Sequence, residues 1–135
     1  LRVLLGPQDQ DFPKESKRLF LDSYFTVSTQ SDRTGIRLSG PALHRKRDLG
    51  DSIISEGIVP GAIQVPGDGQ PIILLVETVT GGYRKIATVI SADLSLLGQI
   101  KPGDQVRFQE VSMAEARTAI QERENHIHLL KKNLG

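Results

Sequence analysis

Valine, isoleucine and leucine occur along the chain in short runs that glycine, proline and aspartate separate from one another. Runs of this kind are typical of half-buried strands joined by tight turns. The pattern therefore predicts a mainly β chain, with strands over 1–5, 24–28, 36–38, 62–65, 72–76, 86–90 and 105–111. Several short strands of this spacing suit a barrel or a sandwich.

Two short helices are expected between the strands. Pro13 can open the first, which runs through Lys14 to Asp22, because proline fits the first turn of a helix. The second should follow Ser91, which can cap it, with Asp93 near the positive end of the helix dipole. It ends before the strong turn signal at 101–104, which reads KPGD.

The C-terminal segment differs in kind from the rest of the chain. Ser112 and Glu115 have the spacing of a capping box, and strong helix formers follow as far as Asn133. This helix carries only a thin apolar stripe, which fits either a helix packed on its own barrel or a peripheral, partner-binding tail. We therefore predict a barrel domain over 1–111 and a helical tail over 112–135. The stripe consists of Met113, Ala116, Ile120, Ile127 and Leu130.

Composition limits the classes of function. The 135 residues suffice for one domain with its own core. The balance of 17 basic and 16 acidic side chains and the aromatic content of 4% argue against a dedicated nucleic-acid binder. The longest apolar run, 72–76, is far too short to cross a membrane. Cysteine is absent, which excludes disulfides and thiolate metal sites and suits the reducing cytoplasm.

Three segments could carry chemistry. The first, SDRTGIRLSG at 31–40, places Arg33 and Arg37 on one face if it is extended, and two guanidinium groups there could grip a carboxylate or a phosphate. Both arginines could equally be ordinary surface residues. In the second segment, 55–71, the side chain of Gln64 faces away from its apolar neighbours in a predicted strand. A structural hairpin closed at Asp68-Gly69 would explain the glycines and prolines of that segment equally well.

The third segment, 72–85, contains consecutive glycines, Gly81 and Gly82. Such a pair lets neighbouring backbone amides point at one spot, and the resulting concavity binds anions or oxyanions. Thr80 and Tyr83 would supply orienting hydrogen bonds, and Glu77 is the carboxylate placed for acid–base work. The alternative is a plain glycine turn with the tyrosine packed against the barrel.

Standard catalytic signatures are absent from the sequence. It contains no serine in a nucleophile elbow, and the glycines, lysine and hydroxyl residues at 80–85 do not have the spacing of a phosphate-binding loop. His126 and His128 are two residues apart, so on a helix they cannot hold a metal jointly as an i, i+4 pair can. We predict no metal site in this chain.

Taken in order, these segments resemble one known family. The similarity runs from about Leu1 to the start of the C-terminal helix, through SDRTGIRLSG, SEGIVPGAIQVPGDGQPIILL and TGGYRKIATVISADLSLLGQIKPGDQVRF. The family contains the C subunit of bacterial ATP-dependent 5-oxoprolinase, also called allophanate hydrolase subunit 2 or KipI antagonist, and the carboxyltransferase domain of urea amidolyase. The chain resembles the C-terminal half of that subunit. Since it opens without methionine, we expect the native polypeptide to continue upstream.

The resemblance implies a cyclophilin-like β-barrel, which agrees with the strand count. It implies a cognate B subunit, itself KipI-like, as the partner and, for 5-oxoprolinase, an A subunit as well. The implied reaction is the opening of 5-oxoproline to glutamate, with ATP used by the whole complex. In the urea amidolyase branch it is carboxyl transfer from biotin to urea. Either substrate is a small amide.

The family's motif positions can be placed on this chain. They imply catalytic roles for Glu77 and Tyr83 and substrate-binding roles for Arg33, Arg37, Gln64, Thr80, Gly81 and Gly82. The motifs also cover Ser31, Asp32 and Gly35.

The chain departs from the family pattern at a few positions. The family usually has an aspartate at or beside Glu77, a glutamine shortly after it and a proline after the tyrosine, where this chain has Thr78-Val79 and Arg84. Thr34 also replaces a more usual apolar residue. The substrate is therefore left open. So are two other functions: a regulatory module that binds a partner without turnover, and a peptidyl-prolyl isomerase, suggested only by the barrel type.

Overall fold

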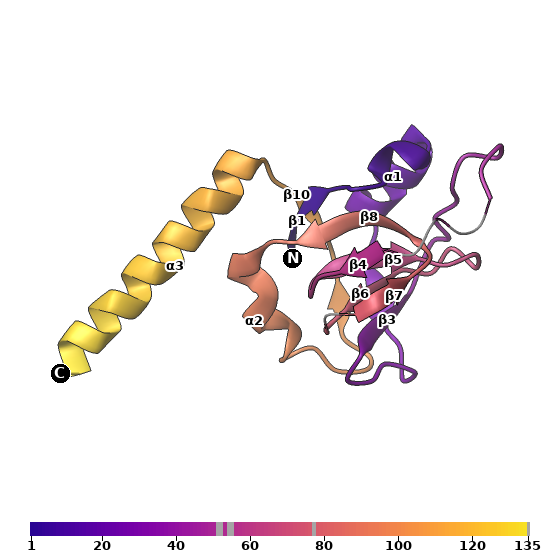
Figure 1. Ribbon diagram of the computed structural model, residues 1–135. Helices are drawn as coiled ribbons and strands as arrows, with labels where there is room; N and C mark the ends of the chain where they lie inside the picture. The colour runs from indigo at the N-terminus through magenta and orange to yellow at the C-terminus, as the bar shows by residue number, and fades with distance from the viewer. Residues whose placement is uncertain (51–52, 54–55, 77, 135) are drawn as a thin grey trace.

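The computed structural model describes residues 1–50, 53, 56–76 and 78–134. Short strands and short helices make up most of the chain, and one long helix ends it (Figure 1). In chain order the elements are β1 (Arg2–Leu5), η1 (Asp9–Asp11), α1 (Lys14–Asp22), β2 (Phe25–Val27), β3 (Gly35–Ser39), β4 (Glu56–Ile58), β5 (Ala62–Val65), β6 (Ile72–Leu74), β7 (Thr78–Gly81), β8 (Arg84–Val89), η2 (Ser91–Asp93), α2 (Leu94–Leu97), β9 (Gln105–Val106), β10 (Gln109–Glu110) and α3 (Met113–Leu134).

The elements agree closely with the hydrophobic pattern. All the expected strands are present, and the last of them is divided into β9 and β10. The first expected helix is α1, with Pro13 directly before it. The second is η2 followed by α2, but the expectation that Ser91 caps it is wrong, because no side chain caps either helix. Two further strands, β4 and β7, lie where the pattern predicts none; they pair with each other as a separate ribbon.

One eight-stranded sheet, in the order β10-β1-β8-β5-β6-β3-β2-β9, forms the body of the molecule. Its two edge strands, β9 and β10, are separated in the chain only by Arg107 and Phe108. A connection of this length spans about 10 Å at most, so the two edges lie close together and the sheet curls round on itself. The predicted fold class, a mainly β, cyclophilin-like barrel with two short helices and a C-terminal helix, is confirmed.

Three phenylalanines, of which Phe108 is distant in the chain from the other two, meet in the apolar core of the barrel. Phe20 from α1, Phe25 from β2 and Phe108 from the connection between the sheet edges are all buried. The rings of Phe20 and Phe108 stack with 4.5 Å between their centroids, and Phe25 lies 5.9 Å from Phe108. Phe108, which lies between the two edge strands of the sheet, therefore also holds α1 against the barrel.

A partly buried ion pair ties the first strand to η2. The Nε and Nη2 atoms of Arg2 donate to the two carboxylate oxygens of Asp93 at 3.1 and 2.6 Å, and the backbone N–H of Arg2 donates to the same group at 2.8 Å. Burial alone would raise the pKa of Asp93, but these hydrogen bonds outweigh it and hold the pKa below its usual range. The Asp93 carboxylate thus binds Arg2 and makes no capping hydrogen bond to α2.

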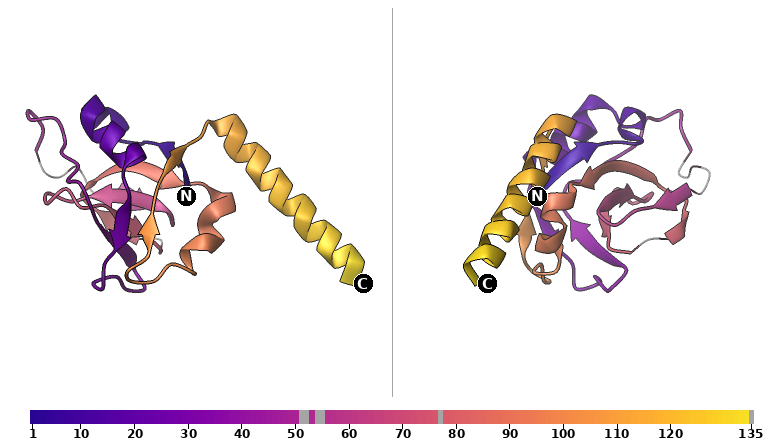
Figure 2. Two further views of the ribbon diagram at one scale, coloured as in Figure 1. Left: turned by 180° about the vertical axis from the view of Figure 1, so that it is seen from behind. Right: turned by 60° about the vertical axis from the view of Figure 1, so that its left-hand side comes forward.

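The capping box at the start of α3 is confirmed. The backbone N–H of Glu115 donates to Ser112 Oγ, and that of Ser112 donates to Glu115 Oε1, each at 3.1 Å. In the first turns of the helix, Ala116 and Ala119 are buried against Ile90 and nearby apolar residues of the barrel. Beyond these turns, α3 extends away from the barrel (Figure 2).

Replacing Phe108 tests how the barrel is closed. Because Phe108→Ala removes a buried ring that touches both Phe20 and Phe25, we expect the free energy of unfolding to fall by about 3–5 kcal/mol in urea denaturation. The control is Leu129→Ala, since Leu129 is 57% exposed on α3; it should change stability by less than about 0.5 kcal/mol. Similar losses in both variants would contradict the role given to Phe108.

Candidate functional site

Strand pairing places four side chains in one row across the sheet, which we call the outer row: Arg37, Ile72, Gln64 and Lys85. Arg37 of β3 pairs with Ile72 of β6, Ile72 pairs with Gln64 of β5, and Gln64 pairs with Lys85 of β8. Paired residues on neighbouring strands point to the same face of a sheet. The adjacent pair Ile63–Ile73 lies in the core, so the outer row faces away from it.

A bulge in β8 brings Lys85 into this row. Ile63 pairs with Ala87, but the next residue, Gln64, pairs with Lys85, so Ile86 is an extra residue in β8. Ile86 and Ala87 both contribute to the core. Without the bulge, regular pairing would set Ile86 beside Gln64. Bulges often re-aim a side chain next to a functional site. Because of this bulge, the residue beside Gln64 is Lys85 and not Ile86.

Lys85 is the most unusual member of the row, because it is only 3% exposed. Lysine is almost never buried to this degree unless other groups compensate its charge, since desolvating an ammonium group is costly. Its main chain is also fixed: its N–H donates to Gln8 Oε1 at 2.9 Å, and its carbonyl accepts from the N–H of Gln8 at 3.0 Å. Adjacent Gln64 is half-buried, whereas Arg37, two strands further, is exposed. The row thus runs from a buried cation through an amide to an exposed cation.

The first sequence motif forms a turn that leads into β3. Asp32 Oδ1 accepts hydrogen bonds from the hydroxyl and the backbone N–H of Thr34, at 2.6 and 2.9 Å, and from the N–H of Gly35 at 3.2 Å. The Thr34 hydroxyl, followed by the two backbone donors, lowers the pKa of Asp32. Arg33 lies in the bend before the strand, so it and Arg37 do not belong to one continuous extended segment. The threonine that departs from the family pattern is thus part of the turn itself.

Arg37 opens onto a groove of about 500 Å³. Its walls include the carboxylates of Asp32 and Asp68 and the amide of Gln70, so the arginine does not face an all-positive surface. The predicted Asp68-Gly69 hairpin lies here: Gly69 has a φ of +78°, and its N–H donates to the carbonyl of Pro66 at 2.9 Å. Arg37 is therefore an accessible cation at the rim of the outer row.

The glycine pair lies where the chain leaves the β4–β7 ribbon and enters β8. Gly81 is the last residue of β7 and pairs with Glu56, while the carbonyl of Gly82 accepts a hydrogen bond from the N–H of Ile53 at 2.7 Å. Tyr83 follows and is 39% exposed. Thr80 lies in β7, and Glu77 falls outside the described residues. Tyr83 is two residues before Lys85, so the glycine pair and the outer row are neighbours along the chain.

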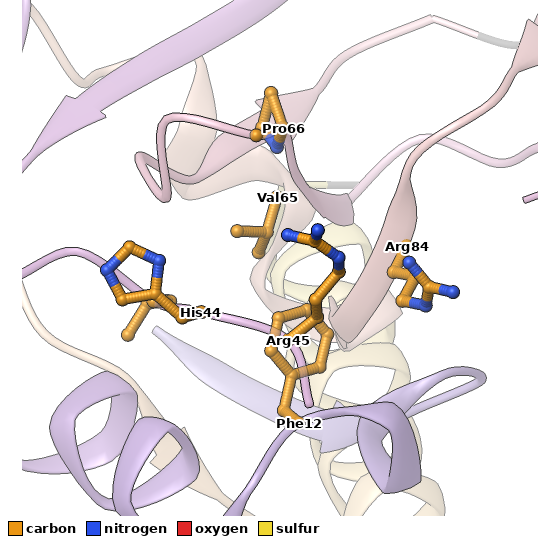
Figure 3. Close-up of a pocket in the computed structure, with 8 residues that line it drawn as sticks. Phe12, His44, Arg45, Val65, Pro66 and Arg84 are labelled. Carbon is orange, nitrogen blue, oxygen red and sulfur yellow. The ribbon is translucent and has the colours of Figure 1, made fainter. Parts of the chain in front are cut away.

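Arg84, between Tyr83 and Lys85, points to the core face of β8, opposite to Lys85, and its side chain fills one end of the barrel. Its Nε donates to Asp11 at 2.8 Å and its Nη1 to the carbonyl of Gly50. Figure 3 shows Arg84 and Arg45 near Phe12 around a small hollow. That hollow has a volume of about 10 Å³, room for one water molecule at most. This end of the barrel is therefore braced and closed, and it offers no substrate pocket.

The hydrophobic pattern did not predict the buried Lys85 or the pair Arg84–Asp11. A signal was present, because the charged residues 84–85 stand directly before the mainly apolar segment 86–90. Among the residues that the structure describes, no group of three or more His, Asp or Glu side chains could hold a metal ion. Over the same ranges, no helix is long and apolar enough to cross a membrane.

The chain is similar to known proteins over nearly its whole length. Residues 1–110 match the family described as carboxyltransferase domain, subdomain A and B. The chain is 39% identical over 131 residues to the C subunit of 5-oxoprolinase from Escherichia coli (strain K12), covering 96% of this chain and 42% of that protein. It is 32% identical to a putative urea carboxylase of Emericella nidulans, covering 94% of this chain and 11% of that protein. It thus spans about two fifths of the length of the former.

The fold is also similar to that of a solved structure. The crystal structure of the Kluyveromyces lactis urea carboxylase superposes with a TM-score of 0.86 at 28% identity. The superposition covers 94% of this chain and 12% of the carboxylase chain. The curled sheet is therefore the architecture found within a much larger enzyme.

The turn at Asp32 predicts a measurable titration. We expect NMR to give Asp32 a pKa below that of an ordinary aspartate, and Thr34→Ala to raise it, because the hydroxyl that favours the charged form is lost. A depressed pKa means that the turn persists above the ordinary aspartate pKa and loosens as the pH falls through the depressed one. The control is Ser28→Ala, which removes a hydroxyl that bonds Gln30 instead. An unchanged pKa in Thr34→Ala would contradict this account of the turn.

Proposed function

Since the chain belongs to the carboxyltransferase domain family, subdomain A and B, we propose that it is the C-terminal part of a subunit of an amide-activating enzyme complex. The substrate is 5-oxoproline, opened to glutamate, or a urea-type amide that accepts a carboxyl group. The similarity to a 5-oxoprolinase subunit over nearly the whole chain supports the first of these. The observation that carries the proposal is the buried Lys85 beside Gln64, in a fold shared with a urea carboxylase.

The outer row suits an amide substrate whose carbonyl oxygen gains negative charge as the reaction proceeds. The Gln64 side chain both donates and accepts hydrogen bonds, so it can match the N–H and C=O of an amide. Lys85 lies one strand away, in a setting of low dielectric where its charge stabilises a developing oxyanion more strongly than it could in water. Arg37, at the exposed end, binds a carboxylate of the substrate.

The remaining predicted positions keep their proposed roles. Tyr83 orients the substrate through its phenol, and Glu77 exchanges protons with it. We also propose substrate-binding roles for Thr80, Gly81 and Gly82, which precede β8 in the chain. Arg33, on the bend before β3, adds positive charge at the rim.

Partner subunits complete the machinery. The chain covers 42% of its E. coli relative, and that protein's name marks it as one subunit of a larger enzyme. We propose a cognate B subunit and, for 5-oxoproline, an A subunit. The glycine run of this chain lacks the spacing of a phosphate-binding loop. We therefore assign the use of ATP to the complex as a whole and not to this run. Biotin takes part only if the reaction is of the urea carboxylase kind.

Substitutions in the complete complex test the proposal. We expect Lys85→Met to lower kcat/KM for ATP-dependent release of glutamate from 5-oxoproline by about 10²–10³-fold, as for loss of an oxyanion-stabilising group. Methionine has a similar shape and needs no solvation of charge, so the barrel should stay folded, which circular dichroism will verify. Arg37→Ala should mainly raise KM, by about tenfold.

The control is Lys101→Met, because Lys101 is an exposed lysine in the turn before β9; it should leave turnover unchanged. Urea-dependent carboxylation is assayed in parallel to identify the substrate branch. Full activity in Lys85→Met would contradict the role of the outer row. A complex that assembles but turns over neither substrate would instead favour the regulatory, partner-binding module.

A further inference from the structure

The second half of α3 approaches the barrel at η2, where Arg123 Nη1 donates to the carbonyl of Ser91 at 3.4 Å and Ile127 lines a crevice with Ser91 and Ala92. These contacts still leave its large apolar side chains 40–57% exposed. Its first turns are anchored by the capping box and by the buried Ala116 and Ala119. Further along, Ile127 is 40% and Leu130 48% exposed, and Figures 1 and 2 show this half projecting away from the sheet. A helical segment of this length is only marginally stable in water on its own.

The apolar positions of α3 follow a coiled-coil pattern. Met113, Ala116, Ile120, Ile127 and Leu130 fall at alternating intervals of three and four residues when Arg123, a polar residue, fills the position between Ile120 and Ile127. Such a repeat marks the seam by which two helices pack side by side. Of the first seam residues, Ala116 is buried against the barrel and Ile120 is half-buried, whereas Met113 is 56% exposed. The seam continues into the exposed half of the helix. A crevice of about 230 Å³ between η2 and α3, lined by Ile120 and Ile127, marks the point where the seam leaves the barrel.

We propose that the exposed half of α3 pairs with the same half of α3 from a second copy of this chain, in antiparallel orientation. In this arrangement Ile127 of one copy packs against Leu130 of the other, and the reverse contact forms by symmetry. The arrangement is a closed, two-fold dimer. Because each helix is anchored to its own barrel at the N-terminal end, the two barrels lie at opposite ends of the pair.

The charges beside the seam identify both the partner and the orientation. Glu124 and Lys131 are exposed and occupy equivalent positions, seven residues apart, on one flank of the seam. In an antiparallel pair equivalent flanks face each other, so Glu124 of each copy meets Lys131 of the other. In a parallel pair Lys131 would instead face His126, and Glu124 would face Ala119, with no opposite charge in either contact. The helix is therefore complementary to itself only when antiparallel.

This inference does not depend on the proposed function, and the mass of the chain in solution tests it. The paired segment is short, so we expect weak dimerisation with a dissociation constant between about 1 μM and 1 mM. Sedimentation equilibrium should show the 14.8 kDa chain shifting toward twice that mass as its concentration rises through this range. Ile127→Glu should keep it monomeric. Leu129→Glu, which changes an exposed leucine off the seam, should leave the dimer intact.

A charge exchange supplies a test that does not disturb the apolar contacts. Glu124→Lys and Lys131→Glu should each weaken dimerisation by roughly tenfold, because both symmetric pairs become repulsive. The double variant E124K/K131E should recover the wild-type constant. The proposal is overturned if the wild-type chain remains monomeric up to millimolar concentration, if Leu129→Glu weakens the dimer as much as Ile127→Glu, or if the double variant fails to recover.

Discussion

The pairing of β5 with β8, including its one-residue bulge, is the constraint on which the candidate site depends. Side chains alternate between the faces of a strand, so a slip of one residue exchanges the core face with the outer face. Ile63 and Ala87 fix the register on the core side, because both are fully buried. One position beyond the outer row, Arg84 holds β8 through Asp11. Lys85 can therefore stand beside Gln64 only while the core and this brace are in place.

Local sequence patterns predicted the features that depend on local physics. The runs of β-branched residues mark the strands of the main sheet, Pro13 marks the start of α1, and Ser112 with Glu115 marks the start of α3. Each of these signals acts over a few neighbouring residues, so no knowledge of the tertiary structure is needed to use it. The family resemblance, which rests on ordered motifs along most of the chain, also holds.

The features that the sequence could not predict arise from contacts between distant segments. The β4–β7 ribbon forms because two weakly patterned segments pair with each other. Asp93 binds Arg2, 91 positions away, and local sequence gives no signal of this interaction. The prominence of Lys85 follows from a bulge, which is visible only in the register of paired strands. Of the substrate-binding residues predicted, Arg37 and Gln64 share the outer row with Lys85, while Arg33 lies in the bend before β3.

The central claim is that the outer row binds the reacting amide. The most direct measurement is a crystal structure of the complete complex with 5-oxoproline or its product glutamate bound. The account predicts polar atoms of that ligand within hydrogen-bond distance of both Gln64 and Lys85, with a carboxylate toward Arg37. A ligand bound elsewhere, with Lys85 still enclosed and out of its reach, would contradict the account.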